Sequence, residues 1–215
     1  MALLKERALY LVLELGLLTI FLMLWVRCQR LEIAVAGCTL LLFVFTLFFF
    51  RDPERTITTD DTAILAPADG KVIGIEENEE FQAFPGASKR VSIYLSLWDV
   101  HVNRMPVSGC IKLVKHVPGK FYAAFRDQSS EKNEHTIIGI ETTRGVVYVR
   151  QIAGILARRI VCRVRKDQKM HQGERYGMIR FGSRVELYLP GNVTLSVRTG
   201  EHVRAGEAVV GRFLS

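Results

Sequence analysis

Three polar groups in this sequence have the side chains that acid–base or nucleophilic chemistry requires. Ser183 follows Gly182, and a serine hydroxyl becomes a nucleophile when a nearby base takes its proton. His101 comes two residues after Asp99, and on a strand both side chains would point to the same face, where a carboxylate can fix the imidazole tautomer. Asp69 stands in a turn-like stretch before glycine. Each residue alone also suits a structural role in a loop or turn.

The cysteines and the other histidines do not indicate a metal site. The four cysteines include no CxxC pair, so we expect neither zinc nor a disulfide framework, and a reducing compartment fits best. They are Cys28, Cys38, Cys110 and Cys162. The remaining histidines, expected at the surface or in packing roles, are His116, His135, His171 and His202.

Two long apolar stretches lie at the start of the chain. Residues 8–26 are apolar apart from Glu14 and one threonine, and residues 33–50 carry no charge. A helix of that length rises about 28 Å, at roughly 1.5 Å per residue, which is enough to span the apolar core of a bilayer. With the polar turn at 27–32, residues 1–50 are therefore predicted to form a transmembrane helical hairpin. Shallow insertion into one leaflet is the alternative.

The charge distribution predicts the orientation and the partners of the chain. The net charge is +7, and the outer ends of the two apolar stretches carry more basic residues than the turn between them. These residues are Lys5, Arg7, Arg51 and Arg55 at the outer ends, and Arg27 and Arg30 in the turn. The bias places the following domain on the cytoplasmic face of the cell (inner) membrane. A basic surface suits anionic lipid, nucleic acid or an acidic substrate, and of these we expect lipid and not nucleic acid.

From residue 51 the sequence has the texture of short strands separated by turns. Runs of β-branched residues alternate with Gly, Pro and Asn, which predicts a mainly β sandwich or barrel-like domain over residues 51–215. Only residues 152–159 invite a helix. The expected strands lie within 64–75, 91–97, 111–117, 136–142, 146–153, 160–164, 185–189 and 193–197.

Two stretches resemble the hairpin strands of lipoyl- and biotinyl-type domains. They are residues 66–72 and 197–211, with their repeated Gly, Val and Ala-Gly-Glu elements. A membrane-tethered carrier or binding domain without decarboxylase chemistry is therefore an alternative function. Such a carrier presents a lysine after Met or Asp at a hairpin tip, whereas Lys169 precedes Met170 here.

Four motifs together resemble the phosphatidylserine decarboxylase family, in its short membrane-anchored branch. They occur in the family's order at residues 50–53, 66–70, 95–106 and 181–184. The resemblance covers nearly all of the domain after residue 50. It implies a self-processing bond between Gly182 and Ser183.

The resemblance also implies the chemistry that follows. Ser183 Oγ attacks the Gly182 carbonyl, and elimination and hydrolysis leave a covalent pyruvoyl group derived from Ser183, with a large chain 1–182 and a small chain 183–215. The pyruvoyl carbonyl forms a Schiff base with phosphatidylserine in an anionic membrane and serves as the electron sink as CO2 leaves, giving phosphatidylethanolamine. A serine-bearing ether lipid is an alternative substrate, and a homo-oligomer is an open possibility.

One position departs from the family pattern. Longer members carry two histidines three residues apart, and this chain has His101 but then Arg104. In that scheme the second histidine, oriented by the aspartate that Asp69 matches, is the base for self-cleavage, and an arginine cannot serve as a base at neutral pH. Either His101 serves both reactions with Asp69 as its partner, which we favour, or Asp69 acts more directly on Ser183. Arg104 and Arg184 are candidates to bind the headgroup phosphate.

Overall fold

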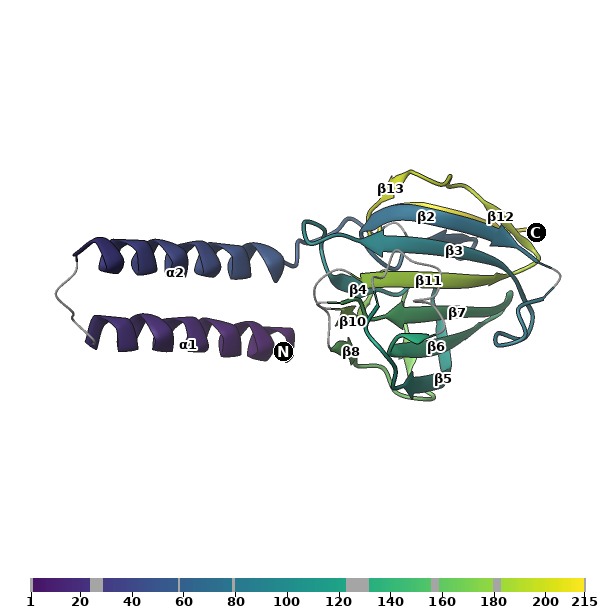
Figure 1. Ribbon diagram of the computed structural model, residues 1–215. Coiled ribbons are helices and arrows are strands. Elements are labelled where there is room, and N and C mark those ends of the chain that lie inside the picture. The colour runs from purple at the N-terminus through teal and green to yellow at the C-terminus, as the bar shows by residue number, and fades with distance from the viewer. Residues whose placement is uncertain are drawn as a thin grey trace. The chain divides into compact units, whose positions relative to one another are not determined.

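The computed structural model of this chain describes residues 2–23, 29–57, 59–78, 80–122, 132–155, 159–179 and 183–214. The chain divides into two units, Met1–Asp52 and Pro53–Ser215, and each is described here by itself (Figure 1). The first unit is helical and the second consists of β-strands.

The first unit contains α1 (Ala2–Met23) and α2 (Gln29–Phe49), so both apolar stretches form helices. Their leucine-rich, proline-free sequences favour this conformation. Thr46 of α2 donates a hydrogen bond to Glu14 of α1, which gives this acid a partner on the facing helix. Over the described residues, no helix combines the length and the apolar character needed to cross a bilayer. The transmembrane character predicted for the hairpin is therefore not supported.

The second unit confirms the mainly β class. Its strands are β1 (Ala63–Leu65), β2 (Gly70–Glu77), β3 (Ala87–Leu95), β4 (Val102–Arg104), β5 (Gly109–Val117), β6 (His135–Thr142), β7 (Gly145–Ile152), β8 (Ile160–Cys162), β9 (Lys169–Met170), β10 (Arg175–Ile179), β11 (Ser183–Pro190), β12 (Val193–Leu195), β13 (His202–Val203) and β14 (Val209–Phe213). The helix expected at 152–159 is wrong over its described part. Ile152 pairs with Arg184 as the last residue of β7, and the chain then runs irregularly to Ile155.

Eight of these strands form one antiparallel sheet in the order β13-β2-β3-β11-β7-β6-β5-β9. This large sheet curls into a half-barrel with β11 between β3 and β7 (Figure 1). Two three-stranded sheets, β1-β14-β12 and β4-β10-β8, contribute side chains to the same hydrophobic core. The core therefore lies inside the curl.

Side chains along β11 alternate between two different environments. Val185, Leu187 and Leu189 are fully buried in the core, as the period of two along a strand requires. Arg184 and Glu186 point to the other face of the sheet, where they are also buried. Burial of apolar surface stabilises the curl by about 25 cal/mol per Å².

The two stretches that resemble lipoyl-type strands lie against each other. The Ala66 N–H donates to the Ala208 carbonyl at 2.8 Å, and the Gly206 N–H donates to the Ala66 carbonyl at 3.0 Å. Residues 66–72 thereby lie along residues 200–208, and from Lys71 onward they also pair with β3. This fixes the turn that carries Asp69.

Gly70, the first residue of β2, tests how tightly this turn is packed. A Cβ at this position would lie 2.1 Å from the Tyr94 carbonyl oxygen, and its φ of +148° disfavours any L side chain. We expect Gly70→Ala to lower the free energy of unfolding by at least about 2 kcal/mol. Gly74→Ala on the same strand is the matched control, because nothing lies within 4 Å of a Cβ there. Denaturant unfolding measures both, and equal losses would contradict the packing described.

Candidate active site

Three strand ends meet at one edge of the large sheet, called the site edge below. β3 ends at Leu95, β11 begins at Ser183, and these two residues are paired. β2 begins directly after Asp69 and pairs with β3 from Lys71 onward. Figure 1 shows the starts of β2 and β11 on the same side as the arrowhead of β3. The fold therefore brings Asp69 and Ser183 to one edge although they are distant in sequence.

Of the two residues at the predicted cleavage site, the structure describes only Ser183. Gly182 lies outside the described residues, together with Arg180 and Phe181. Ser183 is fully buried, and among the described residues its Oγ has no hydrogen-bond partner. An unsatisfied buried hydroxyl costs about 1–3 kcal/mol, and such groups in folded proteins call for an explanation such as a chemical role.

His101 is fully buried, and a tight turn fixes its ring. Its Nδ1 lies 2.9 Å from the carbonyl oxygen of Asp99. A carbonyl only accepts hydrogen bonds, so Nδ1 carries the proton, and Nε2 of the neutral ring is left as the basic nitrogen. Ile179, which precedes Ser183 by four residues, donates its N–H to the His101 carbonyl at 3.4 Å. The geometry thus gives His101 the tautomer of a base close to the cleavage segment.

The predicted role of the Asp99 side chain is wrong. Its carboxylate accepts hydrogen bonds from the backbone N–H and the hydroxyl of Ser96, at 2.8 and 2.6 Å. Residues 96–100 form a turn and not a strand, so the period-two argument does not apply. The Asp99 backbone, instead of its carboxylate, sets the His101 tautomer.

Asp69 is a buried carboxylate held by two donors. Its Oδ1 accepts from the Ala205 N–H at 2.8 Å, and its Oδ2 accepts from Arg55 Nη2 at 2.7 Å. Burial raises the pKa of the Asp69 carboxyl above its usual range, and the two donors partly offset this rise. The negative charge of Asp99 also raises this pKa, which indicates that Asp69 lies near the turn before His101.

The structure adds two polar residues that the sequence did not single out. Gln151 of β7 donates through Nε2 to Asn103 Oδ1 of β4 at 2.8 Å, and both side chains are fully buried. The pair links the large sheet to the β4-β10-β8 sheet close to His101. The available signal was the amide of Gln151 on the same strand face as the buried Val147 and Val149, since buried amides need a partner.

The two arginines predicted to bind phosphate both contact the protein itself. Arg104 donates to the carbonyls of Gly173 and Pro53, at 3.1 and 3.2 Å. Arg184 lies on the face of β11 opposite to Ser183, where it pairs with Glu186 at 3.0 Å. The structure therefore places Ser183 and Arg184 in different surroundings, and the phosphate-binding role of both arginines stays a prediction.

His135, expected to be structural, is buried on the outer face of the large sheet. Its Nδ1 donates to the Asn133 carbonyl at 2.7 Å, and Arg150 Nη2 lies 3.3 Å from its Nε2. Burial lowers the pKa of His135, and the Arg150 charge lowers it further. His135 is therefore neutral in the fold.

This neutral histidine predicts a loss of stability in acid. A base whose pKa falls on folding contributes stability above its unfolded pKa, near 6.5, and this contribution is lost as the pH falls toward the folded pKa. We expect the melting temperature to fall below about pH 6.5, and to fall less in His135→Gln. His116→Gln, at a half-exposed site, is the control. Thermal unfolding across pH measures this, and an unchanged pH slope in His135→Gln would argue against it.

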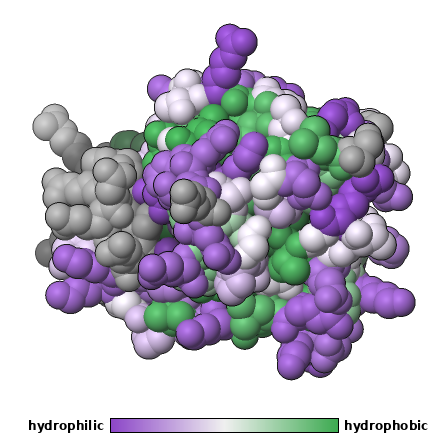
Figure 2. Space-filling model, turned by 90° about the vertical axis from the view of Figure 1, so that its right-hand side faces the viewer, coloured by the Kyte–Doolittle hydropathy of each residue, from purple (hydrophilic) through white to green (hydrophobic). Residues whose placement is uncertain are grey.

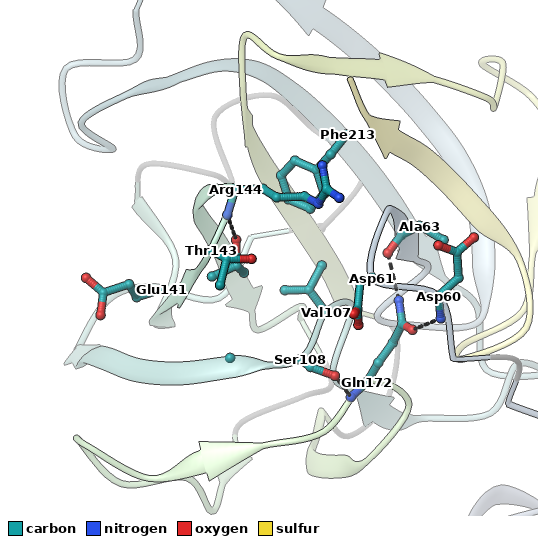
Figure 3. A pocket seen from close by; sticks show the side chains of 12 residues that line it. Asp60, Asp61, Ala63, Val107, Ser108, Glu141, Thr143, Arg144, Gln172 and Phe213 are labelled. Carbon is teal, nitrogen blue, oxygen red and sulfur yellow. Dashed lines mark hydrogen bonds between the residues drawn. The ribbon is translucent and has the colours of Figure 1, made fainter. Parts of the chain in front are cut away.

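A cavity of about 460 Å³ lies at the opposite edge of the large sheet, beside the turn after β6 (Figure 3). Gln172 at this cavity donates to the Ala63 carbonyl at 2.7 Å and accepts from the Asp60 N–H at 3.0 Å, while its own N–H donates to Ser108 Oγ. The surrounding face is largely hydrophilic, with scattered apolar residues (Figure 2). The residues that line this cavity include none of the predicted catalytic residues, so the site edge remains the candidate active site.

Comparison with known proteins connects this geometry to a family. Residues 42–211 match the family model for phosphatidylserine decarboxylase. The chain is 43% identical to the phosphatidylserine decarboxylase proenzyme of Desulfotalea psychrophila over 84% of this chain and 88% of that protein. It is 45% identical to the proenzyme of Prosthecochloris aestuarii, over 85% and 83% of the two chains. For Chlorobium phaeobacteroides the identity is 47%, over 79% and 80%.

Proposed function

The chain belongs to the phosphatidylserine decarboxylase family, and we propose that it converts phosphatidylserine to phosphatidylethanolamine and CO2 after cleaving itself before Ser183. The observation that carries this proposal is the fully buried Ser183 at the site edge, whose hydroxyl is not used by the described part of the fold. These relatives are named proenzymes, which agrees with a chain that matures by processing.

In the proposed self-cleavage, His101 takes the hydroxyl proton of Ser183 at Nε2 while Oγ attacks the Gly182 carbonyl carbon. The amide C–N bond breaks and an ester forms. Loss of the Ser183 α-proton then expels the Gly182 carboxylate, and hydrolysis of the remaining dehydroalanine gives the pyruvoyl group and ammonia. Burial of Ser183 favours this route, because water that entered earlier would hydrolyse the ester and regenerate serine.

The residues present fit a pyruvoyl cofactor, since its precursor Ser183 is buried with an unused hydroxyl, and the ring of His101, also buried, is oriented through Nδ1. The group supplies a carbonyl that takes up the electron pair released with CO2. His101 then returns a proton to the substrate carbon, and the ionised Asp69 nearby stabilises the positive charge on the imidazole while it holds that proton.

Replacing Ser183 tests both reactions together. We expect Ser183→Ala to stay as one chain and to lose decarboxylation, because neither the ester nor the cofactor can form. Ser92→Ala, at another buried serine of the same sheet, should still be cut. A denaturing gel and the mass of a fragment 183–215 with a pyruvoyl start provide the measurement. An active wild-type chain of full mass would exclude the proposal.

Replacing His101 separates the two roles assigned to it. We expect His101→Ala to slow both self-cleavage and decarboxylation by at least about 100-fold, the usual contribution of a general base. The control is His116→Ala, whose side chain is half exposed and lies on β5. Gel analysis reports cleavage, and CO2 release reports turnover. Normal cleavage with lost turnover would transfer the first role to Asp69.

We further propose that the helical unit binds the membrane by shallow insertion into one leaflet, with the β domain on the cytoplasmic face. Ten apolar side chains of α1 and α2 are more than half exposed: Val12, Leu13, Leu15, Leu17, Ile20, Ile33, Leu40, Leu41, Leu42 and Val44. So large an exposed apolar surface is unusual unless lipid or protein covers it. An anionic membrane is the partner that a lipid substrate and a basic chain favour.

The site edge itself has the composition of a lipid-facing surface. Trp98, Tyr122 and Ile155 follow β3, β5 and β7 where these strands reach this edge, and they are 69%, 37% and 56% exposed. Exposed Lys120 and Arg159 lie in the same group of loops. Aromatic and basic side chains together suit the headgroup region of an anionic bilayer. We propose that this edge meets the membrane when substrate enters.

Trp98 provides the test of this surface. We expect Trp98→Ala to raise the KM for phosphatidylserine in vesicles roughly tenfold, the effect of losing about 1.4 kcal/mol of interfacial binding, while self-cleavage stays normal. The matched control is Leu214→Ala, an exposed apolar residue that follows β14. Vesicle assays measure the KM of both variants, and equal values would refute a role for this edge.

A further inference from the structure

The segment that follows the helical unit is built into the active site of the β domain. Residues 53–57, called the strap below, are held by side chains from several loops and strands. Arg104 donates to the Pro53 carbonyl at 3.2 Å, and Arg175 pairs with Glu54 at 2.8 Å. Ile57 packs so closely that a Cβ added to Gly206 would lie 2.7 Å from it. The strap therefore belongs to the domain and is not a loose linker.

Arg55 is the strap residue that reaches the proposed catalytic groups. Its side chain is only 8% exposed, so the reading of Arg55 as a lipid-flanking charge does not describe its surroundings. Nη2 lies 2.7 Å from Asp69 Oδ2, and Nη1 lies 3.2 Å from Glu207 Oε2. One guanidinium thus connects a carboxylate of the site edge with a carboxylate in the loop before β14.

The charges around Asp69 explain why this contact matters. Among the described residues, the charged groups that face Asp69 are Arg55 from the strap and Asp99 from the turn before His101, with Glu207 behind Arg55. Burial and Asp99 both favour the neutral carboxyl, whereas Arg55 and the Ala205 N–H favour the carboxylate. Without Arg55 the balance moves toward a neutral acid, which cannot stabilise a positive imidazole.

We propose that Arg55 is a positioning residue for self-cleavage, which holds the Asp69 carboxylate charged and directed by a hydrogen bond from the strap. This inference rests on the proposed function, in which Asp69 assists His101 during the attack by Ser183. It gives the strap a task inside the reaction, in addition to joining the two units of the chain.

The test follows the pH dependence of self-cleavage in the full-length chain. Wild type, Arg55→Gln and Arg55→Lys are made by cell-free synthesis, transferred to buffers of different pH, and followed on a denaturing gel. In Arg55→Gln the pH of half-maximal cleavage on the acid side should rise by about one to three units, because a nearby opposite charge lowers the pKa of an acid by that amount. Arg55→Lys keeps the charge and should shift less. Glu54→Gln breaks only the exposed ion pair of the strap and should not shift.

The outcomes separate this inference from the proposed function. If the pH of half-maximal cleavage does not change in Arg55→Gln, while Asp69→Asn still abolishes cleavage, the role of Arg55 is overturned and the proposed function stays intact. Normal cleavage in Asp69→Asn would overturn the role of Asp69 and, with it, this inference. An uncut wild-type chain that is active would overturn the proposed function itself. If Arg55→Gln fails to fold, as judged by thermal unfolding, Arg55→Met decides, because it keeps an apolar stem and removes the charge: a rise in the pH of half-maximal cleavage supports the role, and an unchanged pH rejects it.

Discussion

The proposed active site depends on keeping a carboxylate charged where water is largely excluded. Asp69 is buried, and burial alone would favour its neutral form. A backbone N–H from Ala205 and the guanidinium of Arg55 oppose this tendency. Because these donors come from the C-terminal loops and from the strap, the site needs both ends of the β domain to be in place. The tight turn at Gly70 belongs to the same constraint, since it sets where Asp69 lies.

The alternation of β11 separates two kinds of polar chemistry. Ser183 lies among the buried groups of the inner face, whereas Arg184 pairs with Glu186 on the outer face, where Arg150 is also close. A buried ion pair is costly to break, so this outer network helps to fix the start of β11. The two sequence neighbours Ser183 and Arg184 therefore lie in different surroundings, on opposite faces of the sheet.

The sequence predicted the strands well because apolar alternation and turn residues are local signals, as residues 185–189 illustrate. The motif order indicated Ser183, His101 and Asp69 through resemblance, and the fold places two of these at strand ends of one edge. The residues that hydrogen-bond to these groups and set their charge could not be predicted from the sequence. The Asp69 carboxylate meets a residue 136 positions away, and the Asn103–Gln151 pair spans 48 positions. Such contacts depend on strand order, which local patterns do not encode.

The place of Ser183 in the sheet has a consequence for the matured molecule. β11 pairs along its length with β3 and over five residues with β7, and β14 completes a second sheet with β1 and β12. A cut before Ser183 therefore leaves two polypeptides interlocked as complementary fragments of one domain, each lacking strands that the other supplies. The short fragment cannot be exchanged without unfolding the long one. Under the proposed function, each molecule therefore keeps one irreplaceable reactive carbonyl, and chemical damage to that carbonyl would end its activity permanently.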